Sequence, residues 1–227
     1  MQIAIVGYGK MGKLITVLAE EKGYDIVLKT NSNLPFEKCN LKDVDVAIDF
    51  STPETAFNNI SHAIKNNIPI ISGTTGWLEK LEEIKKLCTK YNGAFLYASN
   101  FSIGVNMFFK INTELAKLMQ NKNYKTSISE THHLEKLDKP SGTAKTLSED
   151  IHKELKITPN IISHRIEKKI GTHEIMYESA IDNIKIVHEA KSRDGFALGA
   201  LKAAEWIRNK NGIFSMQDVL SLSLIHI

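Results

Sequence analysis

The sequence has few cysteines and no long hydrophobic run, and each shortage argues against a class of protein. Its 227 residues include only Cys39 and Cys88, which lie far apart and form no CxxC pair. Neither a disulfide framework nor a cysteine-based zinc site is indicated, and a reducing compartment is expected. No apolar stretch approaches the length of a membrane span, and no secretion signal is visible. We expect a cytoplasmic protein without a membrane partner.

An excess of one charge sign is also missing. The chain has 29 basic and 26 acidic residues, a net charge of +3, and the two signs are interleaved. Because no basic patch or stripe stands out, we predict no nucleic-acid partner. The hydrophobic content of 42% is ordinary for a globular protein. The length suits one nucleotide-sized domain with a smaller second one.

The first 100 residues alternate short β-rich runs with amphipathic helical stretches. This pattern produces parallel sheets through βαβ crossovers. Ser51-Thr-Pro-Glu54 is typical of a helix start, with hydroxyl caps, an early proline and an acid. The predicted strands are Gln2–Val6, Asp25–Lys29, Val44–Phe50, Ile68–Ser72 and Ala94–Ala98. We therefore predict an α/β fold that begins with a Rossmann-type parallel sheet.

The pattern changes after residue 125, where a smaller α+β domain with a mixed or antiparallel sheet is predicted. The short gap at Asp182-Asn183 favours an antiparallel hairpin. The β-like runs are 126–130, 173–179 and 184–190. The predicted helices are 104–122, 143–155 and 196–209, with the last two against one face of this second sheet.

The expected domains follow this change of pattern. Residues 1–103, with a C-terminal segment of about 196–227, are assigned to dinucleotide binding. Residues 104–195 are assigned to substrate binding and oligomerisation. The two expectations for residues 196–209 differ, because a helix on the second sheet would not belong to the first domain.

A GxGxxG motif directly follows the first predicted strand and opens a predicted helix. Its glycines permit a tight turn and close approach of the backbone to a pyrophosphate, which the helix N-terminus then holds. A glycine-rich turn without function is the competing interpretation, and the flanking strand and helix disfavour it. The motif consists of Gly7, Tyr8, Gly9, Lys10, Met11 and Gly12.

The acid that usually follows about 20 residues later and binds a ribose hydroxyl is absent. The second strand ends instead in Leu28-Lys29-Thr30-Asn31. Lys29 would neutralise a 2′-phosphate, or it would simply be a solvated strand end. We therefore expect NADH or NADPH as cofactor, with weak discrimination between them.

Two further segments leave the carboxyl edge of the predicted sheet, where ligands of such sheets bind. As plain turns they would be unremarkable, so a functional role and a structural one remain open. The first contains Gly73, Thr74 and Thr75, and the second contains Ala98, Ser99, Asn100 and Phe101.

The densest ionisable cluster is Glu130-Thr-His-His-Leu-Glu-Lys136. If the segment is helical, His132 and Lys136 lie on one face, where a proton donor and a cation would meet one ligand. Surface histidines on a loop are the alternative. No metal is predicted, because the other histidines are distant in sequence and lie in strand-like segments.

The segment Lys139-Pro-Ser-Gly-Thr-Ala-Lys145 predicts a turn that leads into a helix start. The amides at such a terminus bind anions such as a carboxylate. Ser141 also satisfies an ordinary N-cap, so both interpretations stay open.

Together these motifs resemble the 4-hydroxy-tetrahydrodipicolinate reductase family, long called dihydrodipicolinate reductases. The likeness extends over nearly the whole chain, and the segment from the histidine pair to PSGTA is its most specific part. The matching stretches are GYGKMG, DVAIDFSTPE, GTTG, ASNFSIGVN, ETHHLEKLDKPSGTA, SHR, GTHE and HEAKSRDGFALGAL.

The resemblance implies reduction of 4-hydroxy-tetrahydrodipicolinate, with loss of water, in the diaminopimelate pathway of lysine synthesis. It implies that His132 is the proton donor and that Lys136 is a companion donor or substrate contact. The dicarboxylate substrate would be bound by His133, Ser141, Gly142 and Thr143. The resemblance also implies a homotetramer formed through the C-terminal sheet.

Some features depart from the family, and two other functions compete. The chain is short before Val44, the family acid is absent there, and residues 221–227 match nothing recognisable. A sugar or amino-acid dehydrogenase would share the nucleotide half but would not need PSGTA behind a histidine pair. A redox-sensing module would normally carry a DNA-binding element, and no helix-turn-helix pattern is evident.

Overall fold

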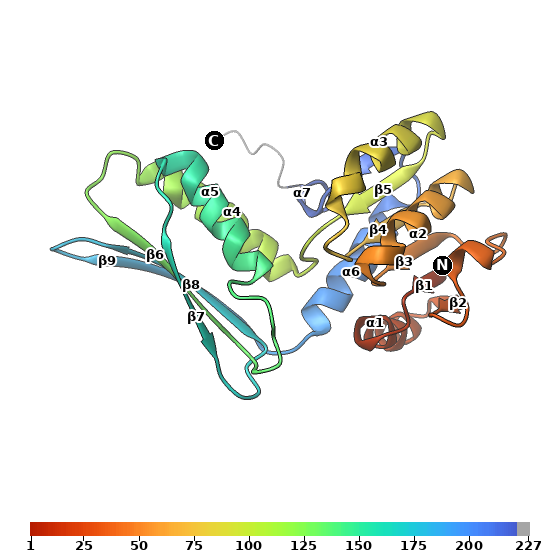
Figure 1. The fold of residues 1–227 in the computed structure, drawn as a ribbon, viewed down its shortest axis with the longest axis horizontal. Coiled ribbons are helices and arrows are strands. Elements are labelled where there is room, and N and C mark those ends of the chain that lie inside the picture. Colours follow the sequence, from red (N-terminus) through yellow and green to blue (C-terminus); the bar gives the residue numbers. More distant parts are fainter. Residues whose placement is uncertain (222–227) are drawn as a thin grey trace. The chain divides into compact units, whose positions relative to one another are not determined.

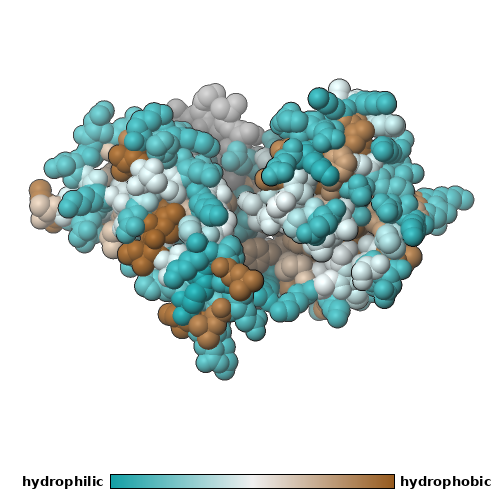
Figure 2. Space-filling view, viewed as in Figure 1, coloured by the Kyte–Doolittle hydropathy of each residue, from teal (hydrophilic) through white to brown (hydrophobic). Residues whose placement is uncertain are grey.

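The computed structural model describes residues 1–221, which form two compact units. The first comprises Met1–Ser102 and the chain from Phe196 onward, and the second comprises Ile103–Gly195 (Figure 1). On the face shown in Figure 2, isolated hydrophobic patches interrupt a mainly hydrophilic surface. No helix within residues 1–221 is long and apolar enough to cross a membrane.

The first unit contains a six-stranded sheet in which every pairing is parallel, in the order β10-β5-β4-β3-β1-β2. The chain runs outward from β1 to β2 and then returns to β3 on the other side of β1. Ligands of such sheets bind where the strand order reverses. The strands are β1 (Gln2–Val6), β2 (Asp25–Thr30), β3 (Val46–Asp49), β4 (Ile70–Ser72), β5 (Ala94–Tyr97) and β10 (Gly212–Phe214).

Helices cover both faces of this sheet, because the strands carry apolar side chains on both of their faces. Ile3 and Ile5 pack with α1 (Lys10–Glu21) and α6 (Asp194–Ile207). Ala4 and Val6 pack on the opposite side with α2 (Pro53–Lys65) and α3 (Leu81–Lys90). The short elements are η1 (Phe36–Lys38), η2 (Leu78–Lys80) and α7 (Met216–Val219).

The position of α6 corrects one prediction. We expected residues 196–209 to cover the second sheet, but Ala197, Ala200 and Leu201 are fully buried in the core of the first unit. Helical periodicity reveals an apolar face but not the sheet against which it packs. Helix α2 begins as predicted, with Thr52 as N-cap and Pro53 in the first turn.

The second unit contains a four-stranded mixed sheet in the order β7-β6-β8-β9. Strand β6 (Lys125–His132) pairs parallel with β7 (Asn160–Arg165) and antiparallel with β8 (Gly171–Glu178), which forms a hairpin with β9 (Asn183–Ala190). Helices α4 (Ile103–Leu118) and α5 (Gly142–Leu155) pack on one face, around Ile128, Ile175 and Tyr177. The mixed sheet agrees with the prediction, although β7 and β10 were not predicted.

Candidate functional site

The glycine-rich loop lies at the carboxyl end of β1, and close contacts require two of its glycines, Gly7 and Gly12. Gly7 has φ +90°, and a Cβ there would lie 2.3 Å from the Phe50 carbonyl oxygen. A Cβ on Gly12 would lie 2.4 Å from the Gly7 carbonyl oxygen. Gly9 is the N-cap of α1, and no side chain caps that terminus. The first backbone amides of α1 therefore have no side-chain cap, which is the arrangement in which helix N-termini bind phosphate.

A buried carboxylate organises the neighbouring loops at the same sheet edge. Asp49, at the end of β3, is fully buried and accepts hydrogen bonds from the hydroxyls of Ser72 (2.7 Å) and Thr74 (2.8 Å). The Thr74 hydroxyl in turn accepts the amide of Ser51 at 2.9 Å. Burial raises the pKa of Asp49, while these hydroxyls oppose the shift. Asp49 thus holds the loops after β3 and β4 together.

The remaining predicted cofactor segments follow the strand ends of β1, β4 and β5. A Cβ on Gly73 would lie 2.3 Å from the Phe50 ring, whose centroid is 5.7 Å from that of Phe101. The Asn100 side chain accepts the amide of Ser102 at 2.9 Å. Of the other predicted residues, Tyr8, Lys10 and Met11 lie in the glycine loop and the start of α1, Thr75 follows Thr74, and Ala98 and Ser99 follow β5.

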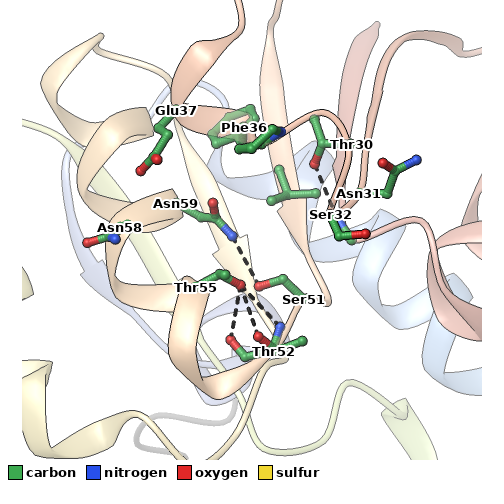
Figure 3. Close-up of a pocket in the computed structure, with 13 residues that line it drawn as sticks. Thr30, Asn31, Ser32, Phe36, Glu37, Ser51, Thr52, Thr55, Asn58 and Asn59 are labelled. Carbon is green, nitrogen blue, oxygen red and sulfur yellow. Dashed lines mark hydrogen bonds between the residues drawn. The ribbon is translucent and has the colours of Figure 1, made fainter.

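A cavity of about 390 Å³ opens next to Gly7 (Figure 3). The strand ends of β1 and β2, the turn η1 and helix α2 form its walls. The lining residues are Val6, Gly7, Thr30, Asn31, Ser32, Pro35, Phe36, Glu37, Ser51, Thr52, Thr55, Asn58 and Asn59. Its position at the reversal of strand order fits the adenosine half of a dinucleotide.

Lys29 does not line this cavity. Its side chain lies on the α1 side of β2, where the ammonium is 3.7 Å from Glu20 and 5.3 Å from the centroid of the Tyr8 ring. Successive strand residues point to opposite faces, so Thr30 reaches the cavity and Lys29 does not. The structure therefore gives no support to the predicted contact between Lys29 and the cofactor.

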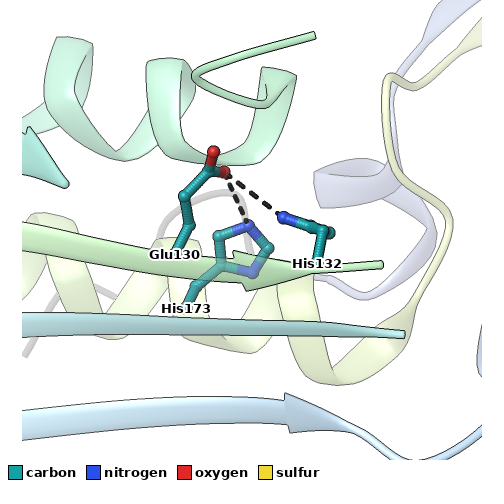
Figure 4. A group of neighbouring side chains, drawn as sticks. All are labelled: Glu130, His132 and His173. Atoms are coloured by element: carbon teal, nitrogen blue, oxygen red, sulfur yellow. Dashed lines mark ion pairs between the residues drawn. The ribbon is translucent and has the colours of Figure 1, made fainter. Parts of the chain in front are cut away.

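In the second unit, the fully buried Glu130 is the centre of a polar cluster (Figure 4). Both of its carboxylate oxygens accept the Ser141 amide at 3.1 Å, and Arg165 approaches one of them to 3.4 Å. His132 Nδ1 and His173 Nε2 lie 3.6 and 3.8 Å from its Oε2. Burial would raise the pKa of Glu130, but hydrogen bonds from Ser141 and Ser163 lower it below its usual value.

His132 is buried at the end of β6, with its ring centroid 5.0 Å from that of His173. Burial lowers the pKa of His132, and the Glu130 carboxylate opposes this shift. Burial and the neighbouring His132 lower the pKa of His173 to about 3, so His173 is neutral. A Cβ on Gly171 would lie 3.2 Å from His132 Nε2, so this glycine leaves room for the ring.

The segment around Lys136 is not helical. We expected His132 and Lys136 to lie on one helix face only if this segment was a helix, and that condition is wrong. His132 ends a strand, and Lys136 lies in the loop that follows. Arg165 holds this loop by donating to the carbonyl oxygens of Lys136 and Asp138. The Lys136 ammonium bonds to the Asp138 carboxylate at 2.7 and 3.0 Å.

The other predicted substrate contacts lie around this loop. His133 Nε2 is 3.5 Å from the Arg193 guanidinium. Ser141 is the N-cap of α5, accepting the Ala144 amide at 3.2 Å, and Gly142 and Thr143 form the first turn. The predicted helix start is therefore confirmed, and Glu130 fixes it to the strand that carries His132.

Sequence reasoning missed several members of this cluster. We took His173 to be distant, but the antiparallel register places it directly opposite Glu130. Glu130, His132 and His173 have a spacing that would suit a metal ion. However, Ser141 and the Arg165 cation already contact Glu130, so we interpret the group as a buried polar cluster. The parallel pairing of β6 with β7 likewise places Arg165 opposite His132; the matching stretch SHR contains this residue, but we predicted no role for it.

A nucleotide loop at the switch point of a parallel sheet, with a second α+β unit that carries a buried acid–histidine cluster, defines an oxidoreductase with a Rossmann-type domain. Residues 1–101 match the family model for the dihydrodipicolinate reductase N-terminus, and residues 104–220 match that for its C-terminus. The chain belongs to the dihydrodipicolinate reductase family. This membership decides against the sugar dehydrogenase, amino-acid dehydrogenase and redox-sensor alternatives.

Individual relatives agree with this assignment. A 4-hydroxy-tetrahydrodipicolinate reductase of Christiangramia forsetii is 46% identical, covering 97% of this chain and 98% of its own. A 4-hydroxy-tetrahydrodipicolinate reductase from Staphylococcus aureus is 32% identical, and the match covers 96% of this chain and 100% of the relative. The structure of a dipicolinate-bound dihydrodipicolinate reductase from Paenisporosarcina sp. TG-14 has the same fold, with a TM-score of 0.79 at 20% identity over 96% of this chain and 98% of that one.

Proposed function

We propose that the protein reduces 4-hydroxy-tetrahydrodipicolinate to tetrahydrodipicolinate with NADH or NADPH, a step of the diaminopimelate pathway of lysine synthesis. One observation carries the proposal beyond family membership. A single buried carboxylate, Glu130, lies 3.6 Å from His132, on the same strand, and accepts the Ser141 amide at the start of α5. An acid and an anion-binding helix terminus are therefore fixed to each other, as reduction of a dicarboxylate requires.

The substrate carboxylates are bound by groups that the loop and helix provide. The N-terminal turn of α5, at Gly142 and Thr143, favours negative charge through its amides and its dipole. The Lys136 ammonium offers a second, charged contact. To bind the substrate carboxylate it leaves its ion pair with Asp138. The Arg193 guanidinium, 3.5 Å from His133 Nε2, adds a further cation beside the same loop.

His132 supplies the proton. When bound, a reduced nicotinamide would supply a hydride after the substrate has lost water, and the carbon next to the hydride acceptor takes up a proton. Burial lowers the pKa of His132 in the free protein, which makes its protonated form a stronger acid. Two substrate carboxylates nearby favour the charged imidazolium, so substrate binding promotes protonation of the residue that then donates the proton.

The first unit supplies the cofactor site. The GxGxxG loop and the free start of α1 suit the pyrophosphate, and the cavity beside Gly7 suits the adenosine. The loops that Asp49 holds, including Gly73, Thr74 and Thr75, suit the nicotinamide half. Asp49 touches no cofactor in this proposal and acts only by positioning Thr74.

A coupled assay tests the function. Dihydrodipicolinate synthase, pyruvate and aspartate semialdehyde generate the substrate, and loss of the reduced cofactor is followed by absorbance. We expect cofactor oxidation only when all three components and the protein are present. Oxidation without the synthase, or none with a fully active synthase, contradicts the proposal.

We also propose a homotetramer formed through the second sheet, in the cytoplasm. Helices α4 and α5 cover one face of this sheet, while the other face carries Ile162, Ser129, Glu174 and Val187 in one row across four strands. Ile162 and Val187 are about half exposed, at 48% and 51%. Light scattering tests this state, with Ile162→Lys expected to yield smaller species. A monomeric wild-type protein would contradict the proposal.

A further inference from the structure

The cavity beside Gly7 has an unusual charge composition for a reductase that would accept both cofactors. Among the residues that line the cavity in Figure 3, Glu37 is the only acidic or basic one. NADPH differs from NADH by a 2′-phosphate, which Rossmann domains normally pair with an arginine near the end of β2. No basic residue lies among the lining residues of this described cavity.

The polar groups at the end of β2 are already engaged within the protein. The Thr30 hydroxyl accepts the Gly7 amide at 3.4 Å, and the Thr30 carbonyl accepts the Tyr8 amide at 2.8 Å. The Asn31 side-chain oxygen accepts the amides of Asn33 and Leu34 at 2.9 and 3.2 Å. The strong acceptor that this family of folds places at the strand end is thus not available from Thr30 or Asn31.

Glu37 has the opposite character. Among residues 1–221, no side chain forms an ion pair or hydrogen bond with its carboxylate. The turn η1 that carries it is anchored by Phe36, which is 1% exposed and packs edge-on against His62 with centroids 5.4 Å apart. Glu37 is therefore held at the cavity by a rigid neighbour while its own carboxylate stays open to a ligand.

We propose that Glu37 is the specificity-determining residue of the cofactor site and that it selects NADH over NADPH. This inference rests on the proposed function. A carboxylate accepts hydrogen bonds from the hydroxyls and amino group of an unphosphorylated adenosine. A 2′-phosphate would enter the same cavity without a cation and beside a like charge, both of which are unfavourable. Lys29 offers no compensation, because it faces Glu20 on the other side of the strand.

Steady-state kinetics with both cofactors test the proposal. We expect kcat/KM of the wild type to be at least about tenfold higher with NADH than with NADPH. Glu37→Gln should bring the two values within about threefold of each other, and Glu37→Arg should favour NADPH. Glu20→Gln is the matched control, because it removes one negative charge outside the cavity and frees Lys29. Its NADH preference should equal that of the wild type.

Three results would overturn the inference. They are equal use of both cofactors by the wild type, an unchanged preference in Glu37→Gln, or a gain of NADPH use in Glu20→Gln. Calorimetric binding of 5′-AMP and 2′,5′-ADP, without substrate, separates this inference from the proposed function. If 5′-AMP binds more tightly and Glu37→Gln removes the difference while the coupled assay shows no turnover, the selectivity stands and the reductase assignment fails.

Discussion

Both carboxylate oxygens of Glu130 lie 3.1 Å from the backbone nitrogen of Ser141. This contact joins strand β6, which ends in His132, to the N-cap of helix α5. A hydrogen bond to a charged group is worth about 1.5 to 3 kcal/mol, so the link between the two is firm. His132, the proposed proton donor, and the start of α5, the proposed carboxylate site, are therefore joined through Glu130, and substitutions on either side test separate parts of one proposed site.

Replacement of His132 by glutamine should affect the chemical step. Positioned proton transfer contributes about 10² to 10⁴ in rate, so His132→Gln is expected to lower kcat by that order. Because the proton moves only in the transition state, KM should stay within a few-fold of the wild type. Steady-state kinetics in the coupled assay measure both constants. A variant with near-normal kcat would show that another group donates the proton.

Lys136 should act mainly on substrate binding. Loss of a charged hydrogen bond costs about 1.5 to 3 kcal/mol, or roughly ten- to a hundred-and-fifty-fold in kcat/KM. For Lys136→Ala this loss is expected largely in KM. Asp138→Asn is a matched control, because it releases Lys136 from its ion pair and should lower KM. A fall in kcat at unchanged KM for Lys136→Ala would instead make Lys136 the better candidate for the proton donor.

Pyridine-2,6-dicarboxylate should compete with the substrate and bind more tightly as the pH falls. Burial places the pKa of free His132 below its usual value of 6.5, and the bound carboxylates raise it again. Binding therefore takes up a proton, and affinity rises as the pH falls toward the pKa of the free protein. Competition kinetics and calorimetry over a pH series measure this. In His132→Gln the pH dependence should disappear, and non-competitive inhibition would place the compound elsewhere.

His173 should make the protein less stable in acid. Its pKa is about 3 in the folded protein against 6.5 when unfolded, so below pH 6.5 the unfolded state binds the extra proton. The free energy of unfolding falls as the pH drops from about 6.5 toward 3, with this residue contributing about 1.4 kcal/mol per pH unit. Urea denaturation at a series of pH values gives the free energy of unfolding of the wild type and of His173→Gln. Below pH 6.5 this free energy should fall less steeply with falling pH in the variant. Above pH 7 the difference between the two free energies of unfolding should be constant. If the two proteins show parallel plots of this free energy against pH at all pH values, the prediction is wrong.

The sequence predicted local features well, because they depend on residues close together in the chain. The GxGxxG turn and the helix starts at Pro53 and Gly142 lie where the glycine, proline and hydroxyl residues indicate. The cofactor preference was harder to predict. We looked for a charge at the end of β2 and found Lys29, but the alternation of strand side chains turns it away from the cavity.

The residues that surround His132 could not be predicted, because strand pairing brings them together. Glu130 and His173 are 43 residues apart, yet the antiparallel register of β6 and β8 places them opposite each other. Arg165 reaches the site because its own strand, β7, which we did not predict, pairs parallel with β6. Register depends on the packing of whole faces, which a single sequence pattern does not specify.

The packing of α6 has a consequence for the order in which the chain is completed. A Cβ on Gly199 would lie 1.8 Å from the Phe101 carbonyl oxygen, and Ala200 and Ala204 share one core with Ile3 and Ile5. The unit that begins at Met1 thus lacks part of its interior until α6 has been synthesised. Domains fold as units during synthesis, commonly from the N-terminus. Here residues 103–195 are all available before the first unit is complete, so the inserted unit can reach its native state first, while the first unit waits until α6 has been synthesised.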